Sequence, residues 1–253
     1  VGIRKTVILI TILSVLGIYA CVFFLKEKQL TQNRPKSESL GFMKSVSHLK
    51  DKEIILYFLG YFFFFCGFNI LRGDLTYYLS AVMQKDIKFL TVISVILFGM
   101  AGMFFPITNK FGKKYSYKKV LIADMLLLIA GTFGLLFINK NTSTFAYVFF
   151  IICGTGLSGA AFIFPQAMLS EISAKLSETK KVSLEGFMFG IQGMFLKLAF
   201  LVQQVVQSTL LVVGNNNTEG VKGATELGVK VTLVVALVLF AASLFFYNLK
   251  KED

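Results

Sequence analysis

One lysine lies near the middle of a long apolar segment, in line with small and polar residues. Lys197 comes 11 residues after Gly186, where the segment begins, which is about 16 Å along a helix. The spacing puts six residues on one helical face: Gly186, Gly190, Gly193, Lys197, Gln204 and Ser208. A charge at mid-bilayer costs about 2.5–3.5 kcal/mol on insertion scales, so such a residue is a functional candidate by default. We predict that Lys197 and Gly193 face a solute or an ion; the alternative is that Lys197 pairs with a buried carboxylate for stability alone.

A second apolar segment, around residues 145–168, is rich in small residues. Thr155, Gly159, Phe162 and Gln166 share one helical face of it. Small residues four apart permit close helix packing in lipid, whereas a proline such as Pro165 bends a helix and is tolerated where a cavity is lined. The sequence leaves both interpretations open: a packing face, or a cavity wall that includes Phe162 and Gln166.

Three further ionisable residues occur in apolar segments. Arg72 and Asp74 are two residues apart, so they point to different sides of a regular helix and are expected to pair with other helices. Asp124 is about one turn inside a segment end, within reach of loop lysines, and is predicted to form a structural or gating ion pair. Tyr77 and Tyr78 suit an interfacial aromatic belt, at least for one of them.

The composition of the chain indicates the elements that hold these residues. Of 253 residues, 55% are hydrophobic, above the roughly 45–50% of soluble domains. Segments of about 18 or more apolar residues cross a bilayer as helices. The sequence predicts an all-α membrane protein with seven such spans, at 6–25, 54–78, 89–108, 120–138, 145–168, 187–212 and 228–247. Soluble enzymes, nucleic-acid binders and disulfide scaffolds are thereby disfavoured.

The basic residues are distributed unequally between the two sides of the predicted membrane. Of 26 Lys and Arg, 17 fall on one side, seven on the other, and Arg72 and Lys197 within spans. The positive-inside rule places the richer side, with the C-terminus, in the cytoplasm. Membrane topology thus accounts for much of the +12 charge, and no nucleic-acid partner is expected.

Several motifs together resemble a known transporter family. The motifs are the run from Pro165 to Glu171, the Glu185-Gly186 pair with Lys197 twelve residues after Glu185, the tyrosines at 77–78, and the Gly112-Lys113-Lys114 loop. They resemble the glycoside–pentoside–hexuronide:cation symporters, the melibiose-permease-like branch of the major facilitator superfamily.

The resemblance implies the back end of a twelve-helix transporter. Residues 1–25 would be the last helix of the N-terminal half, 26–53 the central cytoplasmic linker, and 54–253 the C-terminal six-helix half-bundle. The coupling cation, Na⁺ or H⁺, would be bound mainly by N-terminal helices that are absent from this chain. No other cofactor and no resident metal site are expected, because the single histidine, His48, has no partner at ligand spacing.

The same resemblance assigns roles to individual residues. Lys197 would lie at the solute and cation site, Gln192 would contact the solute, and Phe162 would stand where relatives stack a tryptophan on a sugar ring. Glu171, Glu185 and Lys113 would belong to the gating loops. The chain departs from the pattern in having no Trp, and Ala174 and Ser183 replace expected charged residues.

The function expected from the sequence is secondary active transport in the plasma membrane, by alternating access and for a sugar or related polar solute. The alternatives are a non-transporting half-transporter or scaffold, and a relative that carries a nucleoside, a lipid or an organic acid. An enzyme is not expected, because the chain has no cluster of catalytic residue types at one membrane face.

Overall fold

The computed structural model describes residues 2–24, 51–180, 184–214 and 223–249. The chain divides into two compact units, Val1–Glu38 and Ser39–Asp253. All regular elements of the described residues are helices. The predicted linker at 26–53 lies almost wholly outside them.

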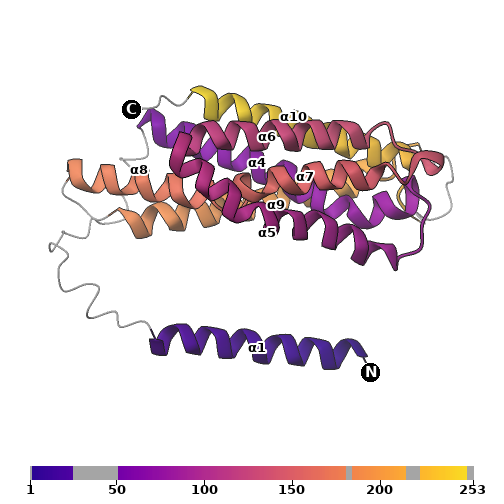
Figure 1. Cartoon of the computed structure of the whole chain (residues 1–253), viewed down its shortest axis with the longest axis horizontal. Coiled ribbons are helices and arrows are strands. Elements are labelled where there is room, and N and C mark those ends of the chain that lie inside the picture. The colour runs from indigo at the N-terminus through magenta and orange to yellow at the C-terminus, as the bar shows by residue number, and fades with distance from the viewer. Residues whose placement is uncertain (1, 25–50, 181–183, 215–222, 250–253) are drawn as a thin grey trace. The chain divides into compact units, whose positions relative to one another are not determined.

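The first unit contains helix α1, Gly2–Phe24 (Figure 1). Its described side chains are exposed and mostly apolar: Leu13 is 61% exposed and Phe23 is 86% exposed. A helix of 23 residues is about 35 Å long, which suffices to cross a bilayer core.

The second unit is a bundle of long helices. Its members are α4 (Lys52–Tyr77), continued by the π-helix η2 (Tyr78–Val82), α5 (Phe89–Tyr115), α6 (Tyr117–Leu135), the 3₁₀ turn η3 (Lys140–Thr142), α7 (Ala146–Ala160), α8 (Phe164–Lys180), α9 (Glu185–Leu210) and α10 (Glu226–Leu249). Helix α4 packs between α10 and α9, while α7 packs against α5 and α6 (Figure 1). The predicted six-segment bundle is therefore present.

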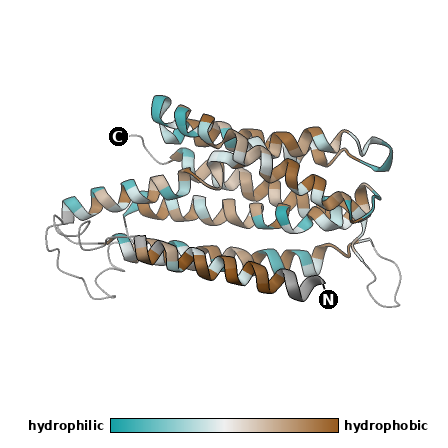
Figure 2. Ribbon diagram, turned by 60° about the horizontal axis from the view of Figure 1, so that its bottom comes forward, coloured by the Kyte–Doolittle hydropathy of each residue, from teal (hydrophilic) through white to brown (hydrophobic). Residues whose placement is uncertain are grey.

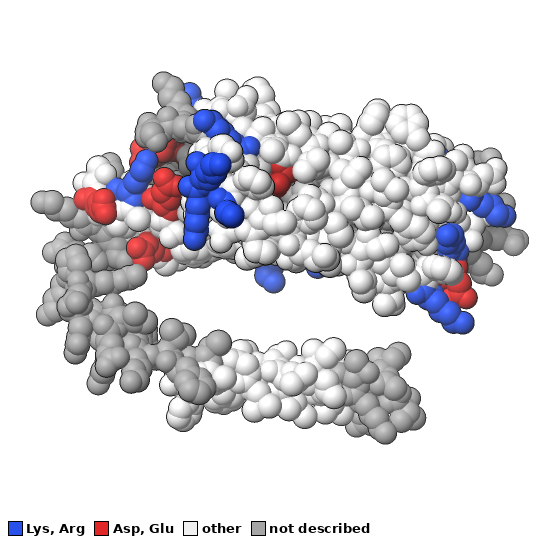
Figure 3. Space-filling model, viewed as in Figure 1, with Lys and Arg blue, Asp and Glu red and all other residues white. Residues whose placement is uncertain are grey.

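Five helical segments of the described residues are long and apolar enough to cross a membrane. They are α4 with η2, α5, α7 with α8, α9 and α10. Apolar residues dominate the middle of the bundle in Figure 2. On the face shown in Figure 3, charged side chains gather mainly at its two ends. Helix α6 is not among the five; it carries Lys118, Lys119 and Asp124 within 19 residues.

The core of the bundle is an aromatic cluster centred on α4. The rings of Tyr57, Phe58 and Phe64 are buried and contact Tyr247 and Phe240 of α10 and Phe195 of α9. Two glycines let α10 approach: a Cβ on Gly60 would lie 3.0 Å from the ring of Tyr247, and one on Gly67 would lie 2.9 Å from Phe240.

The small residues of α7 make close contacts with neighbouring helices. A Cβ on Gly154 would lie against the carbonyl oxygen of Leu97 in α5, and one on Gly156 against that of Asp124 in α6. A Cβ on Gly159 would lie against the Asp124 carboxylate and the ring of Phe164. For these glycines the packing interpretation is the one that the structure favours.

The predicted fifth span is not one continuous helix. It is interrupted at residues 161–163, between α7 and α8, although together they extend over Ala146–Thr179. Pro165 explains the break, because its ring lacks an N–H and clashes with the preceding turn. The remaining six predicted spans match helices, with ends displaced by a few residues.

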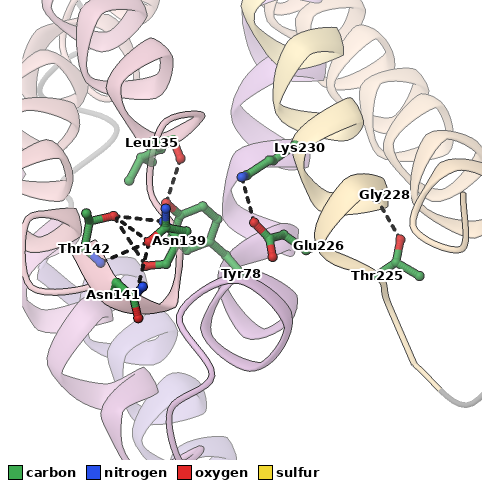
Figure 4. Close-up of polar contacts among 9 residues, drawn as sticks. All are labelled: Tyr78, Leu135, Asn139, Asn141, Thr142, Thr225, Glu226, Gly228 and Lys230. Atoms are coloured by element: carbon green, nitrogen blue, oxygen red, sulfur yellow. Dashed lines mark hydrogen bonds and ion pairs between the residues drawn. The ribbon is translucent and has the colours of Figure 1, made fainter. Parts of the chain in front are cut away.

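Short polar motifs close the connections at one end of the bundle (Figure 4). Asn139 Oδ1 accepts hydrogen bonds from the N–H groups of Asn141 and Thr142, while Thr142 Oγ1 accepts from the N–H of Asn139. At the start of α10, Thr225 Oγ1 accepts from the N–H of Gly228 at 2.8 Å. These caps satisfy backbone groups that would otherwise be unpaired where the helices begin.

Candidate functional site on helix α9

The predicted polar row on α9 is exposed along its whole length. Lys197 comes 12 residues after Glu185 in a helix of 26 residues, close to the middle. Its side chain is exposed, as are Gln204 and Ser208. A Cβ added to Gly190 or Gly193 would meet nothing within 4 Å, and the same holds for Gly186. The row is therefore a shallow, open strip on the surface of the described bundle, with one cation halfway along it.

Gln192 lies on the opposite face of α9, away from Lys197. It is 4% exposed, and its Nε2 donates to Tyr57 Oη at 2.7 Å. Tyr57 Oη in turn donates to the carbonyl oxygen of Pro165 at 2.6 Å. In the conformation described, this amide joins α4, α9 and the start of α8, and it does not share a face with Lys197.

Of the other two predicted solute-contacting residues, Phe162 lies in the break between α7 and α8 and Gln166 in the first turn of α8. Phe162 is 48% exposed and Gln166 is also exposed. Gly159, predicted on the same face, is instead buried against α6. The break thus separates a packed part of this face from an open part that carries Phe162 and Gln166.

Arg72 and Asp74 point to different surroundings, as their spacing indicates. The Cζ of Arg72 lies 5.7 Å from the ring centroid of Phe200 in α9, and its side chain is exposed. Asp74 is 1% exposed, and its Oδ1 accepts a hydrogen bond from Gln207 Nε2 of α9 at 2.8 Å.

Of the two tyrosines that follow, Tyr78 is buried, and its hydroxyl donates to the carbonyl oxygen of Leu135 at 2.8 Å (Figure 4). Of this pair, Tyr77 is the one whose side chain is exposed, as expected for an interfacial aromatic residue.

Asp124 lies in a tight pocket formed by α5, α6 and α7. It is 6% exposed, and its Oδ2 has no hydrogen-bond partner among the described residues. Beside it, the hydroxyl groups of Thr108 and Ser158 are 2.7 Å apart. Among the described residues, no lysine pairs with Asp124 Oδ2, whereas the sequence predicted an ion pair there.

Of the three residues predicted in gating loops, two lie at helix ends and the third, Glu171, lies in the middle of α8. Lys113 is exposed in the last turn of α5, where a cation is favourable beside the helix C-terminus. Glu185 begins α9, where an anion is favourable for the same reason. Glu171 is exposed on α8. These residues are not brought together with Lys197.

Three residues of the buried polar contacts were missed by the sequence reasoning. Tyr57 is one of nine tyrosines in the chain, and nothing in its spacing marks it. Gln203 and Gln207 form a glutamine pair, and each lies one position before Gln204 and Ser208 of the exposed row. Their i, i+4 spacing was the available signal.

Comparison with known proteins decides the family. A family model described as MFS/sugar transport protein matches residues 1–251. The chain belongs to this family. No curated protein matches it. The family and the apolar helices together make the chain a multi-pass membrane protein and a transporter of the major facilitator type, rather than an enzyme.

Proposed function

We propose that this major facilitator protein is a solute:cation symporter that works by alternating access, with a sugar or a related small polar solute as its cargo. The observation that carries the proposal is the exposed row around Lys197 on α9, together with the family. A cation held halfway along an otherwise apolar helix is suited to contact a polar solute. We place the protein in the plasma membrane with its C-terminus in the cytoplasm, from the distribution of its basic residues.

The side chains around the exposed row favour a second helical bundle that faces α9. Large apolar side chains are exposed on the same helix: Phe189, Met194, Leu198, Leu201 and Val205. A polar strip bordered by such residues suits a water-filled cavity between two helical bundles, which rock about a central site in transporters. In this proposal the second bundle is the N-terminal half of the same transporter, and it binds most of the coupling Na⁺ or H⁺.

A binding screen followed by an uptake assay tests the proposal. The purified transporter with both halves is first melted in the presence of glycosides, nucleosides, organic acids and lysolipids. A compound that stabilises it is then tested for uptake into proteoliposomes with an imposed Na⁺ or H⁺ gradient. Lys197→Ala should lower uptake about tenfold or more, because hydrogen bonds to charged groups contribute about 1.5–3 kcal/mol. Lys140→Ala, at an exposed lysine of η3, is the matched control and should keep the parent rate.

Each part of the proposal has its own contrary outcome. Equal uptake by the Lys197→Ala and Lys140→Ala variants would remove Lys197 from the solute site. Stabilisation only by lysolipids or nucleosides would replace the sugar cargo, and uptake independent of both gradients would exclude symport.

A further inference from the structure

A buried polar cluster lies where α4, α9 and α10 meet, away from the exposed row. Its members are less than 10% exposed: Asp74, Gln203, Gln207 and Thr232. It contains a carboxyl group, and the transport site proposed above makes no use of it.

The hydrogen bonds of this cluster leave one carboxyl oxygen of Asp74 unpaired. Gln207 Nε2 donates to Asp74 Oδ1 at 2.8 Å, and Gln203 Nε2 donates to Gln207 Oε1 at 2.6 Å. The second bond fixes the orientation of the Gln207 amide. Asp74 Oδ2 has no hydrogen-bond partner among the described residues, although the side chain is only 1% exposed. Buried polar atoms are rarely left in this state.

The hydroxyl group that approaches from α10 already donates a hydrogen bond elsewhere and can accept one from Asp74. The hydroxyl of Thr232 lies beside the Asp74 carboxyl group. It already donates its hydrogen to the carbonyl oxygen of Val229 at 2.8 Å. A hydroxyl group has one hydrogen and two lone pairs, so the remaining capacity of Thr232 is that of an acceptor.

The remaining surroundings of Asp74 are apolar and narrow. A void beside the carboxyl group is too narrow for a water molecule, and it is lined by Leu71, Leu75, Tyr78, Leu135, Phe150 and Leu233. The Tyr78 hydroxyl donates to the carbonyl oxygen of Leu135 and so is not a donor to Asp74. A coordinated metal cation needs several oxygen ligands, which this void does not supply. A proton is the cation that fits.

The charged groups of the neighbouring elements are engaged elsewhere. On α4 itself, Arg72 lies over the ring of Phe200. On α10, Lys230 pairs with Glu226 at 2.7 Å. The amino group of Lys85, between η2 and α5, lies 5.2 Å from the ring centroid of Phe89.

The two other helices that touch α4 bring no charge to Asp74 either. Helix α5 carries its lysines in its last two turns, at positions 110, 113 and 114. The charged residues of α8 lie towards the opposite end of α4, where Lys175 and Ile172 line a pocket with Asp51 and Glu53.

We propose that the Asp74 carboxyl group is a proton-binding site inside the C-terminal bundle, occupied in the conformation described here. The proton resides on Oδ2 and Oδ1 accepts from Gln207. The site is independent of which solute the protein carries. Gln207 and Lys197 belong to the same helix, so a displacement of α9 would alter both the proton site and the exposed row.

Infrared spectroscopy of the full chain in liposomes tests the site directly, since a protonated carboxyl has its own C=O stretching band. At neutral pH the parent chain should show such a band, with a component that Asp74→Asn removes. Asp86→Asn is the matched control at an exposed loop aspartate, and it should leave the band unchanged. Asp124→Asn identifies any component from the other buried carboxyl group. An Asp74→Asn spectrum that keeps every component of the parent band overturns the proposal.

Gln207→Met keeps the test decisive if Asp74→Asn does not fold. It removes the one hydrogen bond to the carboxyl group but leaves the proton in place. The protonated-carboxyl band should therefore remain and move to higher frequency, because its C=O loses a donor. A change confined to the carboxylate region of the spectrum would show that Asp74 is ionised, contrary to the proposal.

Discussion

Tyr57 connects three helices through a single hydroxyl group. It donates to the carbonyl oxygen of Pro165 and accepts from the amide of Gln192, while its ring packs against Tyr247. Pro165 follows the break between α7 and α8. This hydroxyl therefore holds the start of α8 against α4 and α9.

We expect Tyr57→Phe to destabilise the bundle by about 1–3 kcal/mol, the cost of leaving buried polar groups unpaired. The measurement is the thermal or denaturant midpoint of the purified chain. Tyr61→Phe is the control, because Tyr61 is also buried on α4 and its hydroxyl makes no hydrogen bond to a described residue. Equal midpoints for the two variants would contradict the role given to Tyr57.

For individual residues, the sequence predicted some side-chain surroundings and not others. The helical spacing of the α9 row was sufficient to predict that its residues share one face with Lys197, because helical periodicity determines which residues share a face. The surroundings of Gln192 and Asp74 were not predictable, because they depend on Tyr57 and Gln207, more than 130 residues away in the chain. Periodicity carries no information on which neighbouring helix a buried amide meets.

Glycines bring the backbones of α5, α6 and α7 close together. Gly156 is the clearest example, since a Cβ there would also lie 2.8 Å from the backbone nitrogen of Leu128. In lipid, where apolar side chains gain little by leaving the solvent, such close approach is a principal source of helix association.

Gly156→Ala should therefore lower the stability of the bundle by about 1–3 kcal/mol, because the added methyl group has to push α6 and α7 apart. Gly102→Ala in α5 is the matched control: a Cβ there meets nothing within 4 Å, and alanine favours a helix. Unfolding midpoints of the two variants in one detergent give the comparison. A smaller loss for Gly156→Ala than for Gly102→Ala would show that the α6–α7 contact is loose.

The elements themselves were largely predictable, and their interruptions were not. Apolar length predicted helical segments at all seven positions, and five of the described segments are long and apolar enough to cross a membrane. The break at 161–163 was missed because Pro165 is compatible with either a bend or a full interruption. The hydrogen bond from Tyr57 of another helix to the Pro165 carbonyl oxygen, just after the break, is likewise invisible in the local sequence.

At the scale of the whole molecule, the bundle of the second unit has two charged ends with different basic content. Lysines at positions 110, 113, 114, 118, 119 and 175 belong to the end formed by the start of α4 and the end of α5, whereas those at 85, 88, 140 and 230 belong to the other. This asymmetry is the basis of the proposed orientation.

Cysteine labelling from one side of the membrane measures that orientation. In cells with an intact plasma membrane, Lys140→Cys should react with an impermeant maleimide, and Lys113→Cys should react only after permeabilisation. Both positions are exposed, so access to the reagent is limited by the membrane alone. The parent chain gives the background, with Cys66 and Cys153 buried. The reverse pattern would invert the topology.

Helix α6 has a bearing on how the protein is made. It contains two lysines and one aspartate in 19 residues, and each charge opposes partition of an isolated helix into lipid. Its neighbours α5 and α7 are strongly apolar, and the glycines of α7 accommodate its backbone closely. We therefore expect membrane insertion of α6 during synthesis to depend on its neighbours α5 and α7.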